Sequence, residues 1–181
     1  MGLILGIAAL WGLAEATLFF IVPDVWLTWV LLRHGWRRAA LASLAACGGA
    51  LLGGALMFAW GSTNAEAARN VLEGLPAIAP EMITAAARDL HSAILWPLIE
   101  GGFRGVPYKI YAVEAGAMGT AIAPFMAATV MARLLRFWAA IVIVMVAAGL
   151  LRKRFSETAV KATFAAGWIA FYGVYFTLMP G

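Results

Sequence analysis

Four ionisable side chains stand close together in an otherwise apolar part of the chain, at Glu100, Arg104, Lys109 and Glu114. On membrane-insertion scales a charged side chain costs about 2.5–3.5 kcal/mol at the centre of a bilayer, so such residues in an apolar chain indicate a functional site. Two bases beside titratable carboxylates suit an anionic ligand that is exchanged against protons. Glycine and proline break the helical pattern between them, at Gly101, Gly102, Gly105 and Pro107.

A second break lies near the N-terminus, where Glu15 stands in an apolar run and Pro23 precedes Asp24. If the two breaks meet, four carboxylates face the two bases: Glu15, Asp24, Glu100 and Glu114 face Arg104 and Lys109. Because an unpaired buried carboxylate is costly, these groups must be protonated, bind a cation or pair with Arg133 and Arg136. We expect the four carboxylates to carry proton coupling, with Glu114 first because it has no partner close in sequence.

Arg133 and Arg136 are three positions apart and therefore share one face of a helix. Arginines at a membrane interface are one interpretation, and contact with a lipid phosphate is the alternative. The predicted substrate-binding residues are Arg104, Lys109, Arg133, Arg136 and Tyr108. The sequence has no metal-binding aspartate cluster, Ser/His pair or cysteine nucleophile, and both histidines lie outside the breaks. We therefore expect no cofactor, no metal and no enzymatic activity.

The composition is that of an integral membrane protein. Of 181 residues, 64% are hydrophobic and only 12% are charged, which predicts one transmembrane domain. The formal net charge is +4, but the basic residues sit at the ends of apolar segments. Basic residues in those places set the orientation in a membrane, so we expect membrane lipids as partners and no nucleic acid.

Three segments are predicted to span the membrane: residues 39–60, 125–151 and 160–178. The first carries no charge, and the spacing of Gly49 and Gly53 lets a second helix approach closely. That second helix could belong to this chain or to a second copy in a homo-oligomer. Residues 3–22 are long enough to span alone, but the break at Pro23 and Asp24 favours a re-entrant helical hairpin with its tip there.

A second re-entrant hairpin is predicted around the site. Residues 108–119 form a helix of about 18 Å at about 1.5 Å per residue, which is too short for a hydrocarbon core of about 30 Å. With the apolar run at 92–98 it would make a hairpin whose tip, at 101–106, is not helical. Such a tip is tolerated in a membrane only where protein or a water-filled cavity covers it.

The predicted fold is an all-α integral membrane protein with about three spanning helices and two opposed re-entrant hairpins that form an inverted repeat. Basic clusters at residues 33–38 and 152–161 should be cytoplasmic, which places residues 62–90 and the C-terminus outside. The hairpins then enter from opposite sides. Broken apolar segments at matching places in two halves are typical of a transporter site at the midplane.

One transmembrane domain, 1–181, is expected to contain four parts. The first half-repeat covers 1–60, the second covers 91–151, and the C-terminal helix covers 152–181. Between the halves, 61–90 is an alanine-rich polar connector that predicts two short amphipathic helices on the surface. The connector is either a solvated link or a lid.

The ordered motifs between residues 15 and 137 resemble the DedA (SNARE-associated, VTT-domain) membrane protein family. They are FRGVPYK at 103–109, AG at 115–116, PF at 124–125 and ARLLRF at 132–137. Glu15 and the following VPD at 22–24 resemble the first element of the family, which commonly has Pro-Gly-Glu there. Lys109 stands where an arginine is frequent.

The resemblance implies a bacterial inner-membrane protein that flips or scrambles phospholipids or polyprenyl phosphates. With the paired bases and titratable acids, it predicts a transporter that moves a lipid headgroup, either driven by protons or by passive scrambling. A membrane enzyme acting on a lipid phosphate and a structural or stress-related protein without a substrate are the alternatives.

Overall fold

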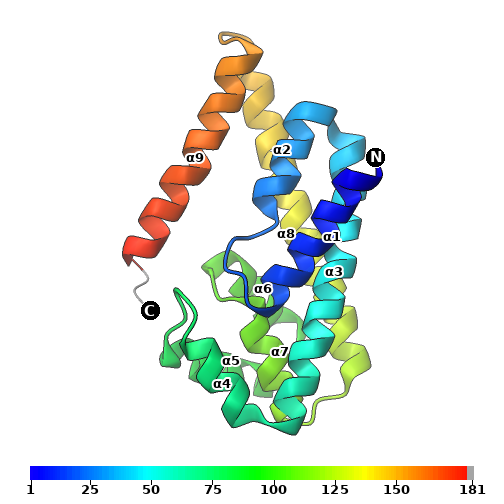
Figure 1. Cartoon of the computed structure of the whole chain (residues 1–181), viewed down its shortest axis with the longest axis vertical. Coiled ribbons are helices and arrows are strands. Elements are labelled where there is room, and N and C mark those ends of the chain that lie inside the picture. Colours follow the sequence, from blue (N-terminus) through cyan, green and yellow to red (C-terminus); the bar gives the residue numbers. More distant parts are fainter. Residues whose placement is uncertain (179–181) are drawn as a thin grey trace.

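The computed structural model describes residues 1–178, so the end of the predicted C-terminal part, residues 179–181, lies outside the described residues. This part of the chain is all helical (Figure 1), as predicted. Its helices are α1 (Gly2–Thr17), α2 (Asp24–His34), α3 (Trp36–Thr63), α4 (Ala65–Glu73), α5 (Pro80–Ser92), α6 (Leu95–Arg104), α7 (Tyr108–Ala117), α8 (Ile122–Leu151) and α9 (Glu157–Leu178).

Two of the described helices, α3 with 28 residues and α8 with 30, are long and apolar enough to cross a membrane. They contain two of the three predicted spans, residues 39–60 and 125–151. The third predicted span, residues 160–178, forms most of α9. With 22 residues this helix is long enough to cross a membrane, but it is lower in mean hydropathy than α3 and α8 and does not qualify as a candidate span.

Glycines let α1 and α3 pack backbone to backbone. A Cβ on Gly12 would collide with the carbonyl of Ala46, and one on Gly49 would collide with the carbonyl of Ala9. A Cβ on Gly53 would come within 2.7 Å of the Leu13 carbonyl oxygen. The helix that approaches the glycine pair of α3 is therefore α1 of the same chain.

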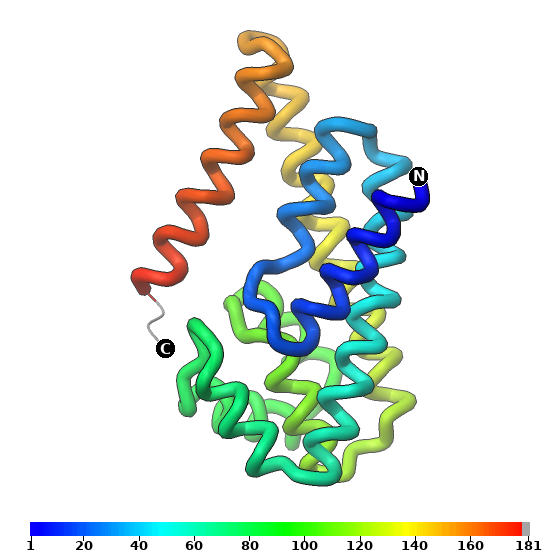
Figure 2. The backbone as a smooth tube through the Cα atoms, viewed as in Figure 1, coloured from blue at the N-terminus to red at the C-terminus, as the bar shows by residue number. Residues whose placement is uncertain are grey.

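The first break is real, and it lies slightly before the predicted tip. α1 ends at Thr17, so its 16 residues cover about 24 Å at about 1.5 Å per residue, less than a hydrocarbon core of about 30 Å. The Trp11 indole donates a 2.9 Å hydrogen bond to the Ile21 carbonyl and so fixes the segment after α1. Figure 2 shows that the chain reverses direction there before α2 begins at Asp24.

The second break is shorter than predicted. Gly101 and Gly102 do not form a non-helical tip, because α6 continues to Arg104. A Cβ on Gly101 would collide with the Tyr111 hydroxyl, so this glycine serves helix packing. The break occupies only residues 105–107, where Gly105 has φ +86°, a left-handed conformation that glycine adopts without strain.

Helix α7 is buried among α3, α4 and α5, in the lower part of the view in Figure 1. Nine of its ten residues are buried, against α3 and against the connector helices α4 and α5. The connector does form two short helices, as predicted, and each turns an apolar stripe inward: Ala68 and Leu72 from α4, and Ile83, Ala86 and Leu90 from α5. Instead of lying free on a surface, the connector covers α7.

Candidate functional site

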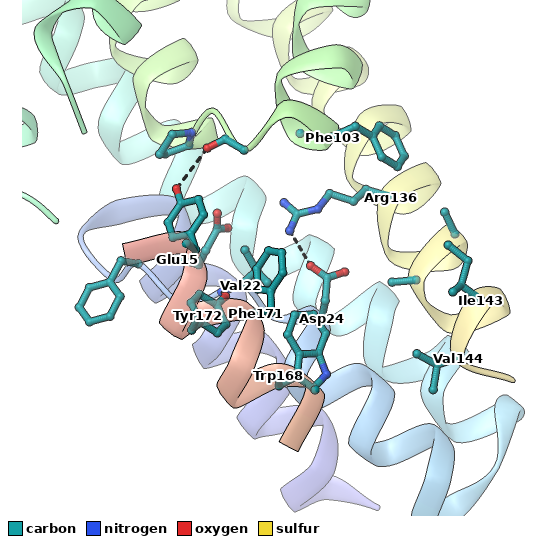
Figure 3. Close-up of a pocket in the computed structure, with 18 of the residues that line it drawn as sticks. Glu15, Val22, Asp24, Phe103, Arg136, Ile143, Val144, Trp168, Phe171 and Tyr172 are labelled. Atoms are coloured by element: carbon teal, nitrogen blue, oxygen red, sulfur yellow. Dashed lines mark hydrogen bonds and ion pairs between the residues drawn. The ribbon is translucent and has the colours of Figure 1, made fainter. Parts of the chain in front are cut away.

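A cavity of about 640 Å³ lies between the two breaks, α8 and α9. Its volume falls within the range of about 300–1,000 Å³ that small-molecule sites occupy. Val22 lines it from the first break and Pro107 from the second, so the two predicted tips do border one space. In Figure 3, Asp24 and Arg136 face each other among the lining residues, with Ile143 of α8 and Phe171 of α9 on either side.

Asp24, which is buried, and Arg136, which is half-buried, form an ion pair at one end of the cavity, called here its charged end. Nη2 of Arg136 donates a 2.7 Å hydrogen bond to Oδ2 of Asp24. Asp24 is also the first residue of α2, where the positive end of the helix dipole favours a carboxylate. Its other oxygen, Oδ1, is buried and has no hydrogen-bond partner among the described residues. One acceptor of this carboxylate is therefore left without a hydrogen bond from the described residues.

Glu15 and Arg133 form a second ion pair, at 2.8 Å, and both residues are buried. The Arg133 guanidinium also lies over the Tyr108 ring, 4.3 Å from its centroid, a cation–π contact that holds the arginine in place. The Tyr108 hydroxyl is within 3.1 Å of the Thr129 hydroxyl. Tyr108 thus positions Arg133, and its hydroxyl points to α8.

Of the two cations that line the cavity, Arg136 is paired with a carboxylate, whereas Lys109 has no carboxylate partner within 4.0 Å among the described residues. It lines the cavity with only 2% of its surface exposed, and its Nζ donates a 2.6 Å hydrogen bond to the Phe19 carbonyl. Because α7 begins one residue earlier, the positive end of the α7 dipole adds to the lysine charge. The start of α7 is therefore suited to an anion.

The formal charge at the site is the opposite of the expected acidic excess. Two carboxylates, Glu15 and Asp24, face three cations, Lys109, Arg133 and Arg136. Of the three outcomes left open for the carboxylates, Glu15 and Asp24 adopt the pairing with Arg133 and Arg136, which leaves Lys109 without a paired carboxylate. Figure 3 shows that the charged end opens onto apolar side chains rather than further acids.

Three residues expected in the site lie elsewhere. Glu100 and Arg104 form an exposed i, i+4 ion pair at 2.8 Å on α6, and neither lines the cavity. Glu114 lies at the far end of α7, where both of its oxygens accept hydrogen bonds of 2.6 and 2.7 Å from Arg69. Glu114 has no partner close in sequence, as expected, but the connector helix α4 supplies a distant one, 45 positions away.

Arg69 is a structural partner of Glu114 that the sequence interpretation missed. Its hydrogen bonds with Glu114 raise the pKa of the guanidinium above its ordinary value, so Arg69 stays charged and fixes α4 to α7. The pair joins residues 45 positions apart, and no local pattern could have revealed it.

The aromatic face of α9 was also missed. Trp168, Phe171, Tyr172 and Tyr175 line the cavity, and their spacing of three and four residues places them on one side of a helix. That periodicity is visible in the sequence and could have indicated a wall of the site.

Among the described residues, no group of three or more His, Cys, Asp or Glu side chains is placed to hold a metal ion. Comparison with known proteins adds no identification: no family model matches the sequence, and neither a curated protein nor a solved structure is significantly similar to it.

Proposed function

We propose that this protein is an integral membrane transporter that moves the headgroup of an anionic or zwitterionic lipid across the bilayer. The observation that carries the proposal is Lys109, a buried cation without a carboxylate partner that lines a cavity next to two ion pairs. A lipid phosphate brings the negative charge that this end lacks. The apolar remainder of the cavity fits the rest of an amphiphile.

The architecture supports transport rather than static binding. The two chain breaks border the same cavity, as the tips of two opposed re-entrant hairpins would. In this proposal α1 and α2 form one hairpin, α6 and α7 form the other, and α3, α8 and α9 span the membrane. A polar break at membrane depth is tolerated because protein and the cavity cover it. The resemblance to the DedA family points the same way.

Proton coupling belongs to the same proposal, with Asp24 and Glu15 as the carriers in place of Glu114. Asp24 keeps one oxygen, Oδ1, that is buried without a hydrogen-bond partner among the described residues, and Oε2 of Glu15 lies 2.8 Å from Nη2 of Arg133 without making a hydrogen bond to it. When a phosphate binds Lys109 or Arg136, it competes with these carboxylates for the cations, and a proton on the carboxylate removes the repulsion. Binding and proton uptake are therefore linked.

The test is reconstitution of the purified protein into liposomes with a phospholipid labelled in its headgroup. Movement of an unchanged headgroup between leaflets supports transport, and Lys109→Gln should lower its rate while Lys109→Arg retains part of it. The exposed variant Arg104→Gln is the matched control. A chemically altered headgroup would support a membrane enzyme instead, and neither movement nor alteration would support a structural role.

A further inference from the structure

Helix α9 has little buried packing against the rest of the molecule, although Phe164 packs near its base and Phe176 contacts Phe20. Of its described residues only Val160, near its beginning, is buried. The turn before it is fixed by the Arg152–Glu157 ion pair at 2.7 Å. Beyond this base α9 runs separately from α8, as Figure 1 shows. A helix anchored at one end in this way can swing about that end.

Two tyrosines bind the free part of α9 to the two chain breaks. The Tyr172 hydroxyl accepts a 2.8 Å hydrogen bond from the Val22 amide in the first break. The Tyr175 hydroxyl donates a 3.3 Å hydrogen bond to the Gly105 carbonyl in the second break. The two side chains are three positions apart and therefore leave α9 on one face. They connect this helix to both breaks at once.

The space that α9 closes is an apolar groove. From α8 it is lined by Ala140, Ile143 and Ala147, and from α9 by Phe164, Gly167 and Phe171. The alanines and the glycine leave room between the helices, and the groove joins the charged end at Arg136. From Arg136 to Leu151, its last lining residue on α8, the helix rises about 22 Å at about 1.5 Å per residue.

The shape and chemistry of this space fit one hydrocarbon chain of a lipid. Its length exceeds the roughly 15 Å that one leaflet of a hydrocarbon core of about 30 Å provides. Its walls are apolar along that length, whereas the end that borders Lys109 and Arg136 carries the cations that a headgroup phosphate needs. An amphiphile with a phosphate at one end and a chain at the other matches both parts.

We propose that α9 is a lateral gate: Tyr172 and Tyr175 hold it against the two breaks, and its release admits a phospholipid chain into the groove between α8 and α9. The inference rests on the proposed function for the identity of the headgroup. It adds the route by which the lipid enters from the membrane. It also assigns the aromatic face of α9 the role of closing that route. When the two hydroxyl contacts open, α9 is still held by its base, by the hydrogen bond from Trp168 to Thr28 of α2 and by the edge-to-face contact of Phe176 with Phe20.

The gate is tested by the position of α9 in lipid nanodiscs. Spin labels on Val174→Cys in α9 and Leu56→Cys in α3, both at exposed positions, report the distance between the helices once the buried native Cys47 is replaced by alanine. The double variant Tyr172→Phe/Tyr175→Phe should shift the distance distribution to longer values and broaden it. Tyr111→Phe, on α7 and away from the cavity, is the control. An unchanged distribution in the double variant would overturn the gate.

The groove is tested with a phospholipid that carries a diazirine in its acyl chain. Irradiation should label Ile143 and Phe171 in the groove as well as outward residues of α8. Ala140→Trp, which fills the groove, should abolish groove adducts and leave outward adducts intact, whereas Val142→Trp on the exposed side should change neither. Groove adducts that are insensitive to Ala140→Trp, or absent in the wild type, would overturn the inference.

Measuring headgroup translocation in the same variants distinguishes failure of the gate from failure of the proposed transport function. If the groove is labelled and α9 moves as expected but no headgroup crosses the bilayer, the gate stands and the transport assignment fails. If the headgroup crosses at the wild-type rate in Ala140→Trp, the transport assignment stands and the groove is not the route.

Discussion

Removing Arg133 should destabilise the protein strongly, because Glu15 would then be a buried carboxylate without a counter-charge. The two side chains are each only 5% exposed and lie 2.8 Å apart. Breaking a buried ion pair on one side costs about 3–5 kcal/mol. Loss of the contact between Arg133 and the Tyr108 ring adds about 0.5–2 kcal/mol.

In a chain of this size each kcal/mol corresponds to about 2–4 °C in Tm, so Arg133→Met should lower Tm by roughly 7–28 °C. The double variant Glu15→Gln/Arg133→Met should recover much of that loss, because both charges are gone and a neutral pair in the same space is tolerated.

The assay is thermal unfolding in detergent, followed by the near-ultraviolet signal of the tryptophans. Arg104→Gln is the control, since its exposed pair with Glu100 is worth only about 0–1 kcal/mol. Additive losses in the double variant, with no recovery, would refute the view that Glu15 and Arg133 stabilise each other inside the fold. Equal losses for Arg133→Met and Arg104→Gln would refute the burial argument itself.

Three further predictions concern the packing of α1 on α3, the connector helices α4 and α5, and proton coupling at Asp24. Gly49→Leu should prevent α1 from packing on α3 and abolish stable insertion. Gly48→Leu is the control, because its Cβ would meet open space. When both variants are purified, Gly48→Leu should keep the wild-type yield and Tm. Arg69→Gln should leave Glu114 buried without its partner and expose the amides of α4 and α5 to hydrogen exchange at least tenfold faster, while exchange in α8 stays as in the wild type. Asp24→Asn should make headgroup translocation in liposomes independent of an imposed pH gradient; a retained dependence, or equal wild-type rates with and without the gradient, would exclude Asp24 as the proton carrier.

Sequence patterns predicted where the helices break, because proline and glycine act locally. The break before Asp24 and the break ending at Pro107 follow from residue types whose backbone preferences hold in any fold. The second break was placed four residues too early, since Gly101 in a helix looks the same in sequence whether it serves a tip or close packing against Tyr111. The close approach at Gly49 was predicted, but the identity of the approaching helix needed the tertiary structure.

The pairing of charges was only partly predictable. That Arg133 and Arg136 share a helix face follows from periodicity, yet Arg133 contacts Glu15 of α1 and Arg136 contacts Asp24 of α2. The acidic excess came from counting only the charges near the breaks. At the cavity the two arginines of α8 reverse that balance, and Glu114, counted there, pairs with Arg69 of α4 instead, a contact between distant segments that leaves no local signal.

If Lys109 binds a lipid phosphate during transport, as we propose, headgroup translocation in liposomes by Lys109→Gln beside Lys109→Arg measures that role directly. We expect Lys109→Gln to lose at least tenfold in rate while its Tm stays within a few degrees of the wild type, and Lys109→Arg to recover part of the rate because it restores the charge. A folded Lys109→Gln variant that moves headgroups at the wild-type rate would show that Lys109 does not bind the phosphate.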